Sequence, residues 1–296
     1  SIGNGAFNQC KSLAHIIIGN GVTSIGNSAF YGCPIEEIVI PDSVTTIGGS
    51  AFSRCTLLTH VIIGNGVTSI GGSAFSNCES LSSVIFGYRV TDIGEYAFLD
   101  CDSLTEISIP NSVITIGRGA FSGCALTEII IPDSVSSIGN GAFSNCTSLS
   151  KVIIGNGVTK IYNSAFYKCT SLTEIVIPDS VTFIGENAFS KCTSLTRVII
   201  GNGVTEIYNS AFSDCTSLTR VIIGNGITGI YNSAFRDCTS LTEIYFQSQT
   251  PPEINSYTFQ GCPSDMIIYY PLGAEANWGT EWQGFATASW EPVVTP

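Results

Sequence analysis

One short unit recurs almost from end to end of this chain, and that period constrains the fold more than any other feature. Twelve Phe-x-x-Cys segments follow one another at intervals of 23 residues, with two intervals of 22 and a last interval of 24. A unit of this length cannot bury its own apolar side chains, so it becomes stable only when neighbouring units stack. The sequence therefore predicts a solenoid of twelve repeats over residues 1–262.

Residues 171–193, "SLTEIVIPDSVTFIGENAFSKCT", show how one unit is organised. The segment "TEIVI" alternates apolar and polar residues and is rich in β-branched side chains, which predicts a short strand. "IPDS", or "IGNG" in other units, predicts the turn that ends it. "VTFIG" is a candidate for a second short extended segment. "ENAFSKC" shows no strand alternation, so we expect one turn of 3₁₀ or α helix there.

The full motif, L-x-x-I-x-I-P-x-S-V-T-x-I-G-x-x-A-F-x-x-C, resembles the BspA-like leucine-rich-repeat family of bacterial cell-surface proteins. That resemblance implies a right-handed leucine-rich-repeat solenoid, with short parallel strands on one face and turns and short 3₁₀ or α segments on the other. It also implies secretion or attachment outside the cell, and it identifies no ligand. The segment "FGYRVTDIG", residues 86–94, departs from the motif; we favour a drifted turn over a local bend or contact.

The two ends of the chain differ from the repeats. Residues 263–296 contain all three tryptophans, and "IIYYPLGAEANWGTEWQGF" resembles the usual terminal segment of the family. We expect these residues to cap the open end of the core and "EPVVTP" to begin a linker; a carbohydrate-stacking patch is the alternative. The start, "SIGNGAF", resembles the second half of a unit, so we expect a piece of a longer protein. Its unpaired sheet edge makes self-association through the solenoid ends conceivable.

Charge and hydropathy exclude several partners. The 296 residues carry a net charge of −12, which argues against nucleic acid and anionic membranes, because phosphate binding needs clustered Lys and Arg. Apolar residues make up 44% of the chain, yet no apolar run approaches the roughly 20 residues that cross a bilayer. We therefore expect no membrane insertion. No signal peptide or anchor is visible in this sequence.

The cysteines all share one position in the repeat. They lie 22–24 residues apart without any C-x-x-C pair, which argues against zinc. Their even number and an extracellular location favour disulfides. However, equivalent residues of stacked repeats point the same way, which does not suit a disulfide torsion of about 90°. We favour a ladder of buried, reduced thiols that fill a small apolar slot in each repeat.

Few residues suggest catalysis, a metal or a cofactor, and we expect none of these. His15 and His60, the only histidines, fall at the same repeat position two units apart. At about 4.8 Å per repeat their rings would be roughly 10 Å apart, too far to share a metal without a third ligand. Glu106 and Glu128 come close in adjacent units, but a glycosidase pair needs a cleft, which a flat sheet lacks.

The outward side of the main strands, which we call the strand face, is the remaining candidate. If Ile175 and Ile177 point inward, Glu174 and Val176 point outward, and the same holds along the array. The charged column comprises His15, Glu37, His60, Ser83, Glu106, Glu128, Lys151, Glu174, Arg197, Arg220 and Glu243. The apolar column comprises Ile17, Val39, Ile62, Ile85, Ser108, Ile130, Ile153, Val176, Ile199, Ile222 and Tyr245.

Nine of the eleven residues in the apolar column are Ile or Val, on a side that periodicity predicts to be open to solvent. A contiguous apolar patch of that size often marks an interaction site. Stacked β-branched residues that merely strengthen the sheet are the other interpretation. We expect a non-enzymatic extracellular binding or adhesion module that holds a protein or glycan partner on its strand face. The alternative is a rigid structural spacer that projects other domains of a larger surface protein.

Overall fold

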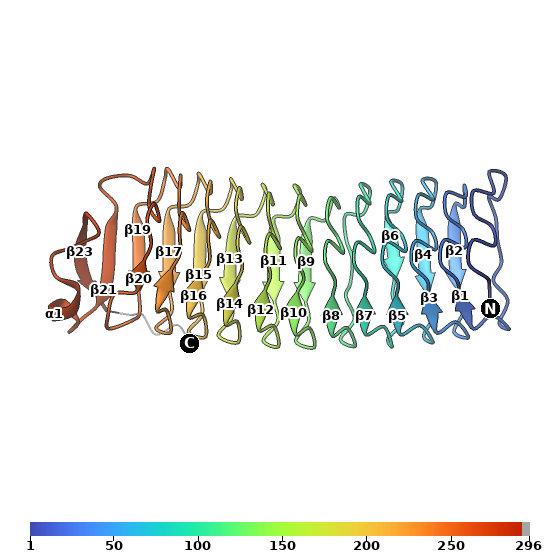
Figure 1. Ribbon diagram of the computed structural model, residues 1–296, viewed down its shortest axis with the longest axis horizontal. Helices are drawn as coiled ribbons and strands as arrows, with labels where there is room; N and C mark the ends of the chain where they lie inside the picture. Colours follow the sequence, from blue (N-terminus) through green and yellow to red (C-terminus); the bar gives the residue numbers. More distant parts are fainter. Residues whose placement is uncertain (292–296) are drawn as a thin grey trace.

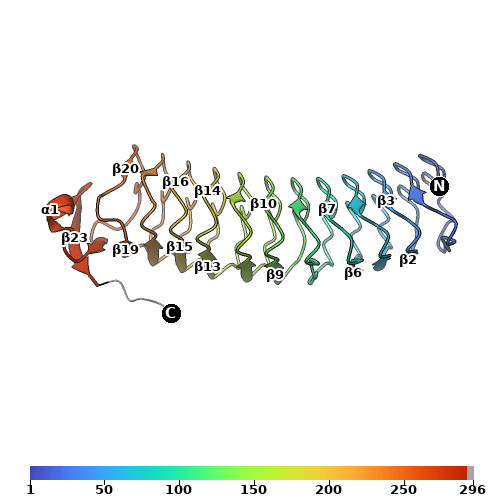
Figure 2. The same cartoon turned by 90° about the horizontal axis from the view of Figure 1, so that it is seen from below.

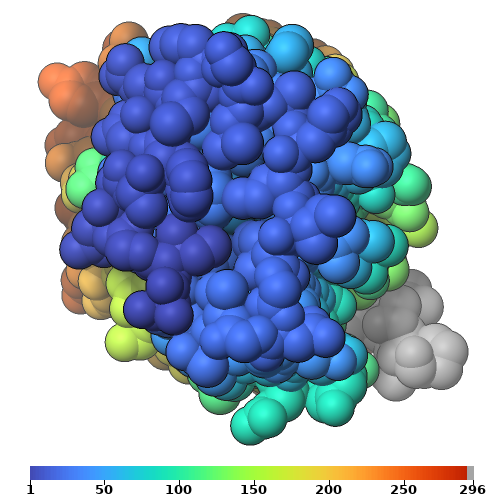
Figure 3. Space-filling view, turned by 90° about the vertical axis from the view of Figure 1, so that its right-hand side faces the viewer, coloured from blue at the N-terminus to red at the C-terminus, as the bar shows by residue number. Residues whose placement is uncertain are grey.

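Two short strands in most repeats generate parallel sheets on two sides of the molecule. In the computed structural model, which describes residues 1–291, successive repeats form the coils of a solenoid whose axis is horizontal in Figure 1. A view turned by 90° shows the same rod with the terminal elements at one end (Figure 2). Seen along its axis from the N-terminal end, the first coils hide most of the chain behind them (Figure 3). The predicted leucine-rich-repeat solenoid is confirmed.

The strand face is formed by the longer strand of each coil. These strands are β2 (Glu37–Ile40), β4 (His60–Ile63), β6 (Ser83–Ile85), β9 (Glu128–Ile131), β11 (Lys151–Ile154), β13 (Glu174–Ile177), β15 (Arg197–Ile200), β17 (Arg220–Ile223) and β19 (Glu243–Phe246). They pair in parallel register, with residues one repeat apart opposite each other, as Glu174 is opposite Arg197. Alternation follows from this geometry: Ile175 and Ile177 are buried while Glu174 and Val176 are exposed, as the period-2 pattern predicts.

The second extended segment of each coil is also confirmed as a strand. Its strands have two residues each: β1 (Ser24–Ile25), β3 (Thr46–Ile47), β5 (Ser69–Ile70), β7 (Asp92–Ile93), β8 (Thr115–Ile116), β10 (Ser137–Ile138), β12 (Lys160–Ile161), β14 (Phe183–Ile184), β16 (Glu206–Ile207), β18 (Gly229–Ile230) and β20 (Glu253–Ile254). They form one uninterrupted sheet of eleven strands. We call this side the second sheet.

The "AFxxC" segments do not form helix, contrary to the expectation. In each coil one residue on either side of the phenylalanine has a left-handed backbone, for example Ser210 (φ 55°) and Asp214 (φ 58°). A left-handed residue interrupts a helix and turns the next peptide groups. Alternate amides therefore reach the next coil: Phe212 N donates to Ala234 O (2.8 Å). The third side of each coil is thus also bonded between repeats.

Phenylalanines stack through the centre of the core. From Phe7 to Phe235, consecutive rings lie 5.2–5.4 Å apart between centroids and within 14° of parallel. The rings from Phe30 to Phe235 are fully buried, whereas Phe7 in the first coil is 39% exposed. Every coil thus adds the same buried ring to one continuous core, and the coils stabilise each other only through their nearest neighbours.

The last elements pack on the end of this core. They are β21 (Ile267–Pro271), α1 (Glu275–Trp278), β22 (Glu281–Trp282) and β23 (Phe285–Trp290). Strand β21 extends the strand-face sheet beyond β19, and β23 pairs with β21. Trp278 is buried, with its ring centroid 5.0 Å from that of Phe246. Within residues 1–291 no helix has the length and hydropathy to span a bilayer. The predicted linker, "EPVVTP", lies beyond the described residues from 292 onward.

Candidate binding face

The apolar column is open to solvent over most of its length. Six of its side chains are between 43% and 58% exposed: Val39, Ile62, Ile85, Ile130, Ile153 and Val176. Ile17, in the first coil, is almost fully exposed. Where neighbouring strands pair in register, as β2–β4–β6 and β9–β11 do, these side chains form rows along the rod rather than scattered points.

The column is less open towards its C-terminal end. Ile199, Ile222 and Tyr245 are half-buried rather than exposed. The Tyr245 ring stacks on Tyr269 with centroids 4.4 Å apart, meets the edge of Trp290, and has the Arg220 guanidinium 5.3 Å from its centroid. An aromatic cluster therefore replaces the aliphatic stripe where the last elements begin.

The charged column is largely neutralised by pairs across adjacent strands. Lys151 lies 3.8 Å from Glu128, and Arg197 lies 3.7 Å from Glu174. Arg220 Nε donates to Glu243 Oε2 at 2.7 Å. Arg197 and Arg220 therefore form no free basic patch, because each arginine faces a glutamate of the neighbouring strand. Exposed pairs of this kind contribute about 0.2–1 kcal/mol each.

Other members of the charged column lie alone. Glu37 and Glu106 are exposed and have no ion-pair partner among the residues that the structure describes. His60 is exposed, and its Nδ1 lies 2.9 Å from the hydroxyl of its neighbour Thr59. Across residues 1–291, no three His, Cys, Asp or Glu side chains gather closely enough to hold a metal ion.

The strand face is not flat, although we expected a flat sheet from the sequence. Its sheet is divided into separate blocks, β2–β4–β6, β9–β11 and β13 onward, while the second sheet is continuous. Residues 105–109 form no strand and pair with neither β6 nor β9. The break lies in the coil after "FGYRVTDIG" and is separated from it by residues 95–104, while Tyr88 and Arg89 form a turn as the equivalent residues of other coils do.

A groove of about 810 Å³ opens at this break, and we call it the central groove. Ser108 replaces the aliphatic residue of the apolar column at its centre. Its lining residues include Ser83, Ile85, Glu106, Ser108, Glu128, Ile130, Asp133 and Ile153. Glu106 and Glu128 therefore do border a groove, and the expectation that the sheet offers no cleft is wrong.

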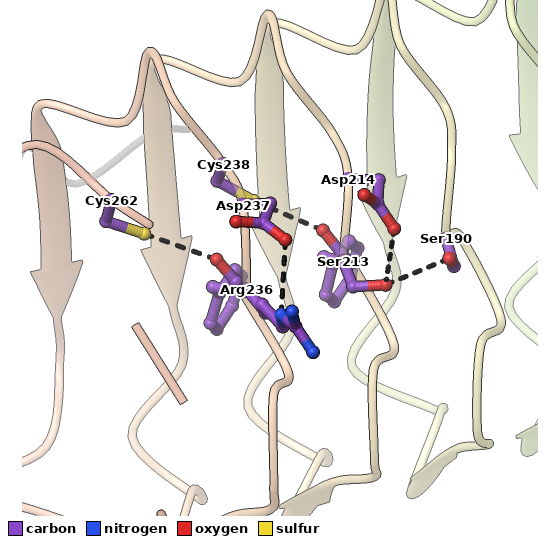
Figure 4. Close-up of polar contacts among 9 residues, drawn as sticks. Ser190, Ser213, Asp214, Arg236, Asp237, Cys238 and Cys262 are labelled. Atoms are coloured by element: carbon purple, nitrogen blue, oxygen red, sulfur yellow. Dashed lines mark hydrogen bonds and ion pairs between the residues drawn. The ribbon is translucent and has the colours of Figure 1, made fainter. Parts of the chain in front are cut away.

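The cysteines form a ladder in the core beside the phenylalanines. All twelve thiols are free; ten are buried, Cys262 is half-buried and Cys10, in the first coil, is exposed. Each thiol from Cys33 on donates to a phenylalanine carbonyl of the preceding coil, as Cys238 Sγ does to Phe212 O at 3.2 Å (Figure 4). Burial raises the pKa of Cys192 and Cys262 to about 12. Such thiols are poor nucleophiles and poor metal ligands at neutral pH.

A column of aromatic side chains on the second sheet was not predicted from the sequence. Tyr162, Phe183, Tyr208 and Tyr231 follow one another with centroids 4.8–6.0 Å apart. Tyr208 and Tyr231 donate to the two carboxylate oxygens of Glu206 at 2.8 and 3.0 Å. These bonds raise the pKa of both phenols. The sequence signal for the three tyrosines was "IY", as in "IYNSAF", at the repeat position where other units have "IG".

These features define a leucine-rich-repeat solenoid with an exposed strand face. The family model for the BspA type leucine-rich repeat region matches residues 1–104, 77–185 and 159–272. The chain therefore belongs to the BspA-type leucine-rich-repeat family. A comparison with curated proteins found no significant match.

Solved structures to which this chain is similar include two bacterial leucine-rich proteins and a pneumococcal antigen. A leucine-rich cell-surface protein from Faecalibacterium prausnitzii is 29% identical over 90% of this chain and 88% of that one, with a TM-score of 0.44. A leucine-rich-repeat protein from Bacteroides ovatus is 24% identical over 86% of this chain and 92% of that one, with a TM-score of 0.45. The pneumococcal vaccine antigen PcpA is 16% identical over 92% of this chain and 78% of that one, with a TM-score of 0.46.

Proposed function

We propose that this chain is a non-enzymatic binding module that acts outside the cell and holds a protein or glycan partner on its strand face. The observation that carries this is the solvent-exposed stripe of Val39, Ile62, Ile85, Ile130, Ile153 and Val176. Soluble proteins rarely leave a contiguous apolar stripe uncovered unless it binds something. Membership of a family of surface proteins supports a role in binding or adhesion.

Catalysis is the less supported function. Glu106 and Glu128 border the central groove, but both are exposed, and Lys151 lies beside Glu128. A glycosidase acid needs apolar surroundings that hold its carboxyl protonated near neutral pH. An exposed carboxylate beside a cation has the opposite environment.

We also propose that the C-terminal segment, through its described residues 263–291, caps the repeat array of residues 1–262. Trp278 and Trp282 pack edge to face at 5.3 Å, and both rings lie against Phe246 at the end of the core. Aromatic rings that cover the last coil remove its apolar surface from water, which a terminal repeat must do. This arrangement supports capping over a carbohydrate-stacking patch for these two tryptophans.

A rigid spacer is the second candidate, and one observation favours it. The second sheet is continuous through eleven strands, and the phenylalanine stack runs through the same coils without interruption. A rod of this kind keeps its ends at a fixed separation, which suits a protein that projects other domains.

The two functions can be separated by substituting the stripe. The triple variant Ile153→Ser, Val176→Ser and Ile199→Ser removes apolar area from the strand face. A matched control, Leu57→Ser, Ile114→Ser and Tyr257→Ser, removes exposed apolar side chains from turns and the second-sheet side. Binding of each labelled protein to coated extracellular-matrix proteins and to a glycan array is measured, with circular dichroism to confirm folding.

For a binding module we expect the stripe variant to lose about tenfold or more in affinity while the control retains it, because interface energy concentrates in a few central residues. If the two variants bind equally, the strand face is not the site. If the unsubstituted chain binds neither surface in saturable fashion, the spacer function stands instead.

A further inference from the structure

We propose that the central groove is the docking site for an extended, lysine- or arginine-bearing segment of a protein partner. This inference rests on the proposed function, since it names the chemistry of a partner for one part of the strand face. Two separate features of the groove support it: its shape and its charge.

The shape comes from a single small residue. Ser108 occupies the position that Ile85 and Ile130 hold on either side along the apolar column, so the stripe is interrupted by a hollow rather than by a polar projection. Ile85 and Ile130 are each more than half exposed and face that hollow from opposite sides. A partner side chain that enters here finds apolar walls for its stem.

The charge at the groove is of one sign. Glu106, Glu128 and Asp133 are exposed carboxylates in its lining, and no Lys, Arg or His contributes to that lining. Lys151 pairs with Glu128 from outside the groove, which leaves Glu106 and Asp133 without a cation among the residues described. Complementary charge steers a partner and fixes its register. A cationic side chain with an aliphatic stem matches both the carboxylates and the isoleucine walls.

The partner is therefore a peptide rather than a small anion or an acidic polymer. Anions are repelled by the three carboxylates, and a neutral sugar would not use the charge. An extended segment that alternates apolar and basic residues uses both the charge and the isoleucine walls, because successive side chains of a strand point to opposite sides.

Two peptides and three protein variants test this proposal with the whole chain. The first peptide alternates lysine and valine, with acetylated and amidated ends, and the second has glutamate in place of lysine. The variants are Ser108→Ile, which refills the stripe, and Glu106→Gln with Glu128→Gln, which removes two charges. Glu79→Gln with Glu95→Gln is the matched control, because both residues are exposed and lie outside the groove. Fluorescence anisotropy gives each affinity at low and high salt.

We expect the lysine peptide to bind about tenfold more tightly than the glutamate peptide, and Ser108→Ile and the double glutamine variant each to lose about tenfold. The control variant should match the unsubstituted chain within about twofold. Equal affinity for the lysine and glutamate peptides, or unchanged binding to Ser108→Ile, overturns the proposal. In that event the stripe variant of the preceding section still decides whether the strand face binds a partner, so the two failures are distinguishable.

Discussion

Alkaline pH should destabilise this protein through its thiol ladder, and the size of the effect follows from the structure. Burial raises the pKa of Cys192 to about 12 from an ordinary value of 9.0, and it raises the pKa of Cys215 well above that value. At pH values between the ordinary and the raised pKa, the unfolded chain releases the thiol proton and the folded chain keeps it. The free energy of unfolding therefore falls as the pH rises, and the thiols' contribution is fully present only below about pH 9.

One pH unit above the ordinary pKa, each such thiol lowers the free energy of unfolding by about 1.4 kcal/mol. Between pH 7 and pH 10, the free energy of unfolding of the double variant Cys192→Ala, Cys215→Ala should therefore fall by about 3 kcal/mol less than that of the unsubstituted protein. The variant starts less stable because two core groups are missing, so the comparison is between slopes rather than between absolute stabilities. Above pH 10 the phenols also titrate, which sets the upper limit of the experiment.

Guanidinium unfolding followed by circular dichroism, in the presence of a reductant at several pH values, gives these slopes. Cys10→Ala is the matched control, because Cys10 is exposed and lies outside the buried part of the thiol ladder. A stability that stays flat from pH 8 to pH 10, or a double variant with an unchanged slope, would refute the reasoning. Such a result would mean that the thiols are accessible to water in the folded protein or already oxidised.

Three further predictions concern single positions. Phe189→Ala should lower the free energy of unfolding by about 3–5 kcal/mol, measured by denaturant unfolding, because this fully buried ring stacks on both neighbours; a loss below about 1 kcal/mol would contradict a close-packed stack. Glu206→Gln should lower the raised phenol pKa values of Tyr208 and Tyr231, seen in an ultraviolet pH titration, since the charged acceptor of both hydroxyls is removed. Gly157→Ala should destabilise the protein by about 1–3 kcal/mol because the new methyl group would overlap Asp133 O, whereas Gly21→Ala meets open space and serves as the control; equal melting temperatures would count against this packing.

Much of the fold follows from the repeat period alone. The 23-residue spacing predicted the solenoid, and the alternation in "TEIVI" predicted which side chains of each strand face water. Both signals are periodic, so every additional copy reinforces them. Burial of the cysteines was predictable for the same reason, since a residue at a fixed distance from a core phenylalanine occupies a fixed place in each coil.

The turns after the second strand were harder to predict. We expected helix where the chain alternates left-handed residues with ordinary ones. Gly, Asn or Asp occupies eight of the twelve positions two residues after the phenylalanine, and these residues tolerate a left-handed backbone best. These residue types were the sequence signal for a left-handed backbone, and a search for apolar periodicity does not detect them.

The central groove could not be predicted from periodicity in any form. The coil that contains residues 105–109 has the usual spacing and the usual inward isoleucines, so its pattern matches that of its neighbours. Whether its backbone bonds to the next coil depends on small differences in distance between coils. Only Ser108 in the apolar column marked the place, and a single small residue has many explanations.

The equivalence of successive coils has a consequence for how proteins of this kind change in length. Residues 191–203 and 214–226 are nearly identical, and the strands within them, β15 and β17, pair residue for residue. Removing or duplicating one whole unit therefore joins ends that already have matching neighbours, because each coil contacts only the coils beside it. Unequal recombination between such units yields longer or shorter rods that fold by the same rules. Each event shifts the central groove along the axis relative to the terminal segment by about 4.8 Å, the spacing of paired strands.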